Sequence, residues 1–166
     1  EAAGYTVVFT REALLALDPD GVDRLLGVFA WEDTYNDNDE ETNTERGLAS
    51  YDPEAPDVAE MARVALAILA RDPDGFFLVA EEEGTDNLSN DNNAAGALEA
   101  LIRADAAVGV FADHVDANPD TLLIMAADSN ASGMTLVGPS AAEVAQLTPE
   151  GVLPRAMANG APLDGV

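Results

Sequence analysis

The stretch GFFLVAEEEGTDN, residues 75–87, joins an apolar run directly to an acidic one. A continuous apolar run of this length is typical of a strand that is buried on both faces of a parallel sheet, so we predict a strand over 76–80. A second run of the same kind, TLLIMA, occupies 121–126 and is followed at once by polar residues. We therefore expect two fully buried strands, each leading into a polar loop.

Segments with helical periodicity lie before and between these two strands. Apolar residues recur at helical spacing over 58–71, and the turn sequence DPDG follows. The segment 94–116 is the longest helix candidate. Its predicted buried side consists of Leu98, Leu101, Ile102, Ala106, Val110 and Phe111. Strands that alternate with helices predict an α/β fold, with a mainly parallel sheet flanked by helices.

The N-terminal third adds two shorter strands and a long acidic segment. Residues 5–9 are β-branched and aromatic and predict a strand, and 25–30 predict a second one. Between them we expect a helix over 11–17 with Thr10 as its N-cap. The stretch 31–56 is rich in Asp, Glu and Asn and lacks apolar periodicity, so we interpret it as a long acidic loop.

The expected domain division is simple. We predict one domain over 1–138 and a tail over 139–166 that is rich in Pro and Gly and contains a weak helix. No stretch approaches the roughly 20 apolar residues that span a bilayer, and no basic segment followed by an apolar core marks a secretory leader. We therefore expect neither a targeting nor a membrane-spanning segment.

The charge balance is strongly acidic. The 166 residues include 32 Asp and Glu, seven Arg and no Lys, which gives a net charge of −25. A field of this sign repels nucleic acids and anionic membranes, so neither is expected as a partner. The sequence has no Cys, which excludes disulfides, thiolate metal ligands and a cysteine nucleophile.

Two interpretations of the charge stay open: a solvated surface adapted to high salt, which we favour, and cation binding. Both predict that the fold loses stability at low ionic strength, because the carboxylates then repel one another without screening. We expect the melting temperature, followed by circular dichroism, to rise steadily with added NaCl. A melting temperature that does not depend on salt would contradict this expectation.

Oxygen-bearing side chains gather in the two loops that follow the predicted buried strands. The candidate ligands are Glu81, Glu82, Glu83, Asp86, Asn90 and Asp91 in the first loop, and Asp128, Ser129 and Asn130 in the second. Because the carboxyl ends of parallel strands form the binding crevice of such sheets, these loops predict a hard-oxygen site for Mg²⁺ or Ca²⁺. Ordinary solvated loop charge and turn caps remain the alternative. The single histidine, His114, is interpreted as an exposed helix residue and not as a ligand.

Five stretches of the chain resemble the alkaline phosphatase family, in order and from about Gly4 to Gly138. The family patterns F-F-L-M-V-E-G-G-x-I-D-H-A-x-H-x-N-D-A-A and N-P-D-T-L-x-x-x-T-A-D-H-E-T-G-G correspond to FFLVAEEEGTDNLSNDNNAAGALEAL at 76–101 and NPDTLLIMAADSNASGM at 118–134. Upstream, GYTVVFTREAL, RLLGVFA and PDVAEMARVAL match further family segments. The resemblance implies the C-terminal part of the family's catalytic domain.

The resemblance also implies a metal site. Glu81 falls on the family's magnesium-ligand glutamate, and Asp86 and Asp128 fall on carboxylate ligands of its two zinc ions. Asn90 and Ser129 stand where the family has zinc-binding histidines, and an amide or hydroxyl binds zinc poorly. We therefore expect weakened Zn²⁺ binding and a site suited to Mg²⁺ or another divalent cation.

The implied activity is that of a metal-dependent phosphomonoester hydrolase. The family's serine nucleophile lies in an Asp-Ser-Ala motif that this sequence does not contain, and Ser129 aligns with the metal motif instead. We therefore expect little or no activity from this chain alone, and the sequence does not decide whether it acts as an enzyme. A non-catalytic pseudo-phosphatase and an acidic, halophilic cation-binding domain remain as alternatives.

The expected partners and location follow from the same resemblance. A phosphate monoester is the implied substrate, and the protein partner is either a second copy of the chain or an N-terminal half that supplies the nucleophile. The family works in the periplasm or outside the cell, so we expect export.

Overall fold

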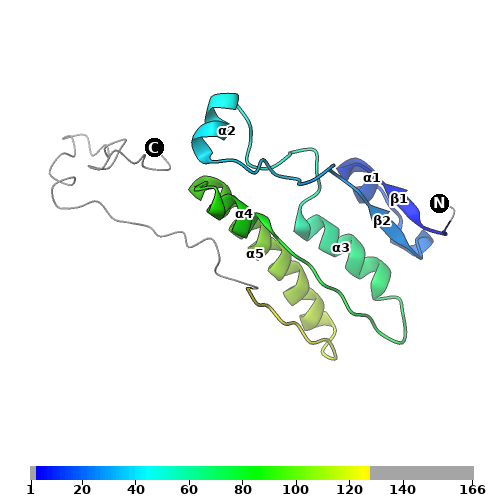
Figure 1. Cartoon of the computed structure of the whole chain (residues 1–166). Coiled ribbons are helices and arrows are strands. Elements are labelled where there is room, and N and C mark those ends of the chain that lie inside the picture. Colours follow the sequence, from blue (N-terminus) through cyan, green and yellow to red (C-terminus); the bar gives the residue numbers. More distant parts are fainter. Residues whose placement is uncertain (1–2, 128–166) are drawn as a thin grey trace.

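The computed structural model describes residues 3–127, which form a small parallel sheet and a set of packed helices (Figure 1). The elements follow in the order β1 (Thr6–Val8), α1 (Arg11–Leu15), η1 (Pro19–Gly21), β2 (Leu25–Gly27), α2 (Glu40–Arg46), α3 (Val58–Leu69), α4 (Gly84–Asn90) and α5 (Ala94–Ala117). This arrangement is consistent with the predicted α/β class. The predicted domain division at 138 and the tail lie outside the described residues.

The N-terminal unit confirms the short strands and the first helix. β1 and β2 pair in parallel, with Thr6 opposite Leu25 and Val8 opposite Gly27. Thr10 is the N-cap of α1, because its side chain accepts a hydrogen bond from the backbone N–H of Ala13 at 3.1 Å. Each strand and the helix are shorter than predicted.

α3 begins at a complete capping box. The Asp57 side chain accepts from the backbone N–H of Glu60 at 2.7 Å, and the Glu60 side chain accepts from the backbone N–H of Asp57 at 3.2 Å. The Arg11 Nε donates to Glu60 Oε2 at 2.8 Å, which ties α1 to the start of α3. The observed helix ends at Leu69, two residues before the predicted end.

α5 buries a face of small residues, and the predicted buried face is wrong in its N-terminal half. Gly96, Ala100 and Ala107 are buried, and α3 and α4 both contact this helix. The predicted core residues Leu98, Leu101, Ile102 and Ala106 are exposed. Small side chains let neighbouring helices approach closely, so the Gly and Ala face turns inward and the leucines turn outward. Val110 and Phe111 pack against the cluster of Val58, Ala59 and Ala107, as predicted.

The two runs predicted as buried strands are not strands within the described residues. Phe77 and Val79 are 89% and 72% exposed, and Leu122 and Ile124 are 81% and 78% exposed. A strand exists only where a neighbouring backbone completes its hydrogen bonds, and β1 and β2 are the only paired strands among residues 3–127. The sheet that the sequence predicts is therefore larger than the sheet of β1 and β2 that the described residues form.

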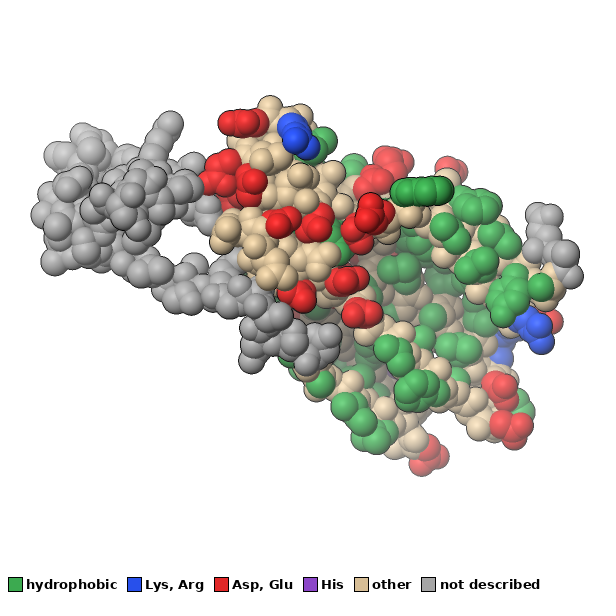
Figure 2. Space-filling model, viewed as in Figure 1, with side chains coloured by type: hydrophobic (Ala, Val, Ile, Leu, Met, Phe, Trp, Pro, Cys, Tyr) green, Lys and Arg blue, Asp and Glu red, His purple; other side chains and the backbone are tan. Residues whose placement is uncertain are grey.

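The acidic segment 31–56 contains a helix, so its interpretation as a continuous loop is wrong. Asp39 caps α2 by accepting from the backbone N–H of Thr42 at 2.7 Å, and Gly47 ends it in the left-handed conformation with a φ of 65°. These are the ordinary start and stop signals of a short helix. An antiparallel bridge joins Tyr35 to Tyr51 across this segment. On the face shown in Figure 2, several acidic side chains lie over α2 and beside it.

None of the helices in residues 3–127 combines the length and apolar character needed to cross a membrane.

The ion pair between Arg11 and Glu60 predicts a pH dependence of stability. The Arg11 guanidinium holds the pKa of Glu60 below its ordinary value, first through its hydrogen bond. A lowered carboxyl pKa contributes stability above the ordinary pKa, about 4.3, and that stability is lost as the pH falls through the lowered value. We expect Arg11→Gln to lower the melting temperature at pH 7 and the difference from wild type to shrink below pH 4.

The matched control is Arg46→Gln, which removes an equal charge from α2. We expect Arg46→Gln to cause no comparable loss of melting temperature at pH 7 that disappears below pH 4. A difference between Arg11→Gln and wild type that stays constant from pH 7 to pH 3 would contradict the assignment.

Candidate functional site

The first predicted ligand loop folds into a turn and a short helix that rest on α5. α4 begins at Gly84, directly after the three glutamates, and its Leu88 is fully buried against Tyr51 and Ala100. Asn93, 1% exposed, links α4 to α5 as the N-cap of α5, accepting from the backbone N–H of Gly96 at 2.7 Å. The three glutamates at 81–83, which we call the acidic turn, are therefore supported by a firmly packed helical hairpin.

The structure brings Asp86 together with Asn90. Asn90 Nδ2 donates to Asp86 Oδ1 at 2.7 Å, one helical turn apart on the same face of α4. Asn87 Nδ2 donates to Tyr35 Oη at 2.9 Å, so this side chain turns toward the acidic segment. Glu81 lies exposed at the start of the turn. Within residues 3–127, no three Asp, Glu or His side chains gather closely enough to hold a metal ion.

The second predicted loop lies outside the described residues. Asp128, Ser129 and Asn130 all fall there, so the convergence of Asp128 with Glu81 and Asp86 stays a prediction. His114 packs instead against Phe76, with the ring centroids 5.8 Å apart in an edge-to-face arrangement. His114 is therefore partly buried, whereas the sequence predicted an exposed residue, and its lack of a ligand role stays a prediction.

Two tyrosines and an arginine shape the site, and sequence reasoning missed them. Tyr51 Oη donates to Glu82 Oε1 at 2.6 Å, and its ring lies 5.6 Å from that of Tyr35. The Arg103 Cζ lies 4.0 Å from the centroid of the Tyr51 ring, a cation–π contact. The only sequence signal was an aromatic residue on each side of the α2 segment. Nothing in the local pattern connects residue 51 with residue 82.

Carboxylates dominate the electrostatics around Tyr35 and Tyr51. Burial raises the pKa of Tyr51, and its hydrogen bond to Glu82 raises it further, so this hydroxyl remains a proton donor at physiological pH. Burial and the charge of Asp33 raise the pKa of Tyr35 in the same way. Partial burial and the nearby charge of Asp91 raise the pKa of Asp37, which is the expected consequence of crowded like charges.

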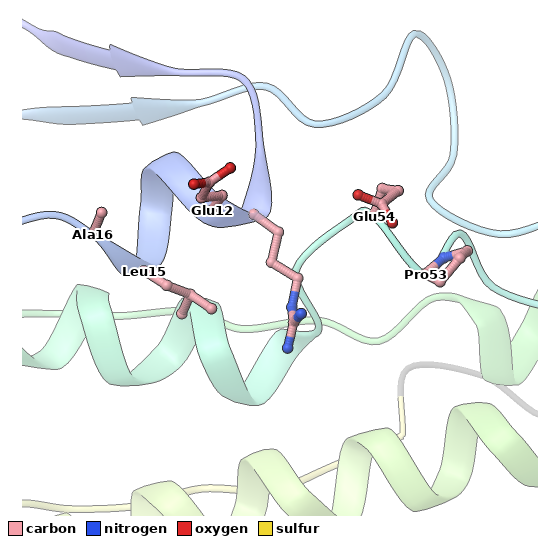
Figure 3. Close-up of a pocket in the computed structure, with 6 residues that line it drawn as sticks. Glu12, Leu15, Ala16, Pro53 and Glu54 are labelled. Atoms are coloured by element: carbon pink, nitrogen blue, oxygen red, sulfur yellow. The ribbon is translucent and has the colours of Figure 1, made fainter.

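An open pocket lies elsewhere, beside α1. Its volume is about 460 Å³, and the residues that line it are Arg11, Glu12, Leu15, Ala16, Pro53 and Glu54, from α1 and the segment before α3 (Figure 3). Arg11 is committed to Glu60, and Glu12 and Glu54 would repel an anion. This pocket therefore lacks the free positive charge that a phosphate site needs, and none of its residues belongs to the acidic turn or α4.

Comparison with known proteins gives a consistent result. The sequence model for alkaline phosphatase matches residues 1–155. The tissue-nonspecific isozymes of alkaline phosphatase from Felis catus and Rattus norvegicus are 35% and 36% identical over 121 residues, which is 73% of this chain and 21% of each relative. The alkaline phosphatase of Gadus morhua is 32% identical over the same length, 23% of that protein. The chain thus spans about one fifth of the length of these relatives.

Gly84 offers a direct test of how tightly the turn is packed. A Cβ at this position would lie 2.0 Å from Tyr51 Oη and 3.0 Å from Tyr51 Cζ, and the buried ring has little room to move. The clash costs about 1–3 kcal/mol, and the gain in helix propensity offsets up to about 1 kcal/mol. We expect Gly84→Ala to destabilise the fold by about 1–2 kcal/mol in urea unfolding.

The matched control is Gly109→Ala in α5, where a Cβ meets open space. Here only the propensity term operates, so we expect this substitution to stabilise the fold by up to about 1 kcal/mol. Equal effects of the two substitutions would contradict the packing of Tyr51 over Gly84.

Proposed function

Because the chain belongs to the alkaline phosphatase family, we propose that it is the C-terminal, metal-binding part of a phosphomonoester hydrolase. The supporting observation is the acidic turn and α4, which carry Glu81 and Asp86 in the family's order on a packed helical hairpin. The whole activity requires more of the family's fold than the one fifth that this chain matches.

We propose that Glu81, Asp86 and Asp128 hold a divalent cation. All three donate carboxylate oxygen, a donor set that suits Mg²⁺ better than Zn²⁺. The contact between Asn90 and Asp86 supports this choice, because the amide nitrogen acts as a hydrogen-bond donor where the family places a zinc-binding imidazole. When bound, the cation would stabilise negative charge on the phosphoryl oxygens.

The chain's own contribution is to hold the carboxylates in place. Asn90 fixes one oxygen of Asp86, and Leu88 anchors the helix beneath it. The carboxylates also disfavour the approach of a phosphate ester until a cation offsets their charge. Substrate binding therefore depends on the cation being in place first.

We propose that the serine nucleophile comes from polypeptide outside the residues matched here, and that this chain alone hydrolyses phosphate esters slowly or not at all. The exposed apolar side chains of Phe77, Val79 and Ile124 support this arrangement, because isolated proteins rarely leave so much apolar surface in water. Either a second copy of the chain or an N-terminal half could cover them. Family membership alone suggests action in the periplasm or outside the cell.

A non-catalytic relative of the phosphatases is the second candidate. The observation that favours it is the side-chain amide of Asn90, which donates a hydrogen bond to Asp86 and so holds this carboxylate without a metal ion. This candidate and the first both predict weak hydrolysis by the isolated chain. The two candidates differ when this chain is joined to the remaining part of a phosphatase fold. The first candidate then predicts hydrolysis of p-nitrophenyl phosphate, and the second predicts none.

Zinc affinity gives the decisive test of inherited geometry. We expect the double substitution Asn90→His with Ser129→His to tighten Zn²⁺ binding at least about tenfold, measured by isothermal titration calorimetry, because two imidazoles restore the nitrogen donors. The control is Asn92→His, at an exposed position two residues after Asn90 and beyond the end of α4, which we expect to leave the affinity unchanged. No gain in the double variant would contradict the proposed alignment of the site.

A further inference from the structure

Glu82 stands in the middle of the acidic turn, between the proposed ligand Glu81 and α4. Where the chain reads Glu81-Glu82-Glu83, the family pattern that it resembles reads Glu-Gly-Gly, so Glu82 is a departure of this sequence. Its side chain is only partly exposed, whereas Glu81 and Glu83 on either side are exposed. Some contact therefore holds Glu82 inward against the repulsion of its neighbours.

That contact is a hydrogen bond from outside the loop. Tyr51 Oη donates to Glu82 Oε1 at 2.6 Å, and the backbone N–H of Gly84 donates to the same oxygen at 3.3 Å. Thr85 Oγ1 donates to the backbone carbonyl of Glu82 at 3.1 Å. The residue that follows Glu81 is thus held through both its carboxylate and its carbonyl.

The donor is itself fixed in place. The Tyr51 side chain is buried in the cluster with Leu88 and Ala100, and Arg103 covers its ring. Arg103 in turn pairs with Glu99 at 2.9 Å along α5. A buried tyrosine held on two sides is a rigid hydrogen-bond donor, in contrast to a side chain that reaches in from solvent.

From this geometry we propose that Tyr51 is a positioning residue for the cation site: by holding Glu82 against the start of α4, it fixes the backbone that carries Glu81 and sets its place relative to Asp86. The inference rests on the proposed function, since Glu81 and Asp86 are proposed ligands. Tyr51 itself contacts neither the cation nor the substrate. Loss of a group that hydrogen-bonds a ligand directly typically weakens metal binding about 10–100-fold, and Tyr51 acts one residue further away, through Glu82.

The test measures Mg²⁺ binding to the whole chain by isothermal titration calorimetry, at a temperature where every variant is folded by circular dichroism. We expect Tyr51→Phe, which keeps the buried ring and removes only the hydroxyl, to weaken Mg²⁺ binding about tenfold. The control Tyr5→Phe removes a hydroxyl from a half-exposed tyrosine just before β1 and should leave the affinity unchanged. An affinity of Tyr51→Phe equal to wild type would overturn the role of Tyr51.

Two substitutions at Glu82 separate positioning from simple charge. Glu82→Gln retains an oxygen that accepts from Tyr51, whereas Glu82→Ala removes it. We expect Glu82→Ala to lose as much affinity as Tyr51→Phe and Glu82→Gln to keep most of it. If Glu82→Gln loses as much as Glu82→Ala, Glu82 acts through its charge and the positioning role is overturned.

Amide exchange of Gly84 in the cation-free chain supplies a readout that needs no metal. We expect its exchange rate, followed by NMR, to rise about tenfold in both Tyr51→Phe and Glu82→Ala. The acceptor of the Gly84 N–H is no longer held in the first variant and is absent from the second. Unchanged exchange would overturn the role of Tyr51. Absence of Mg²⁺ binding by the wild-type chain would instead overturn the proposed function, and with it the ligand role of Glu81.

Discussion

The narrow Gly and Ala face of α5 is the constraint on which the described structure depends. Because Gly96, Ala100 and Ala107 present almost no side-chain bulk, α3 and α4 can both pack closely on this one helix. Leu88 and Tyr51 close over Ala100, while Val58 and Ala59 close over Ala107. A larger side chain at Ala100 would separate α4 from α5 and move the acidic turn away from its support, whereas one at Ala107 would separate α3 from α5.

The few arginines of the chain carry much of the remaining cohesion. Arg11 joins α1 to α3 through Glu60, and Arg103 joins α5 to the Tyr51 ring. Arg71 donates to the backbone carbonyl of Asp20 at 2.9 Å and to that of Val22, which attaches the end of α3 to the segment before β2. In a chain with a net charge of −25, each cation placed at such a junction both links two elements and relieves local repulsion.

The same distribution explains the character of the candidate site. Partial burial and the neighbouring charge of Asp91 raise the pKa of Asp37, so carboxylates of the α2 segment and of the end of α4 crowd one another. A divalent cation relieves such repulsion more effectively than hydrogen bonds alone. Tyr51 and Thr85 hold this turn with neutral donors, and Asn90 holds Asp86 of α4 in the same way.

The sequence by itself determined the family and the two short strands at the start. It also determined the positions of α3 and α5, because capping residues and helical spacing are local signals. It also indicated Glu81 and Asp86 as the residues of interest. The start and stop signals of α2 were present at Asp39 and Gly47, but the absence of apolar periodicity concealed them.

Only the tertiary structure decided which face of α5 turns inward and which distant side chain supports the acidic turn. Periodicity alone favours the leucines for the core, yet the close approach of neighbouring helices selects the alanines. Residues 51 and 82 are brought together by packing on Ala100, a contact between distant parts of the chain that no local pattern encodes. Local signals specify where an element starts and ends, whereas shape complementarity between elements specifies what each one contacts.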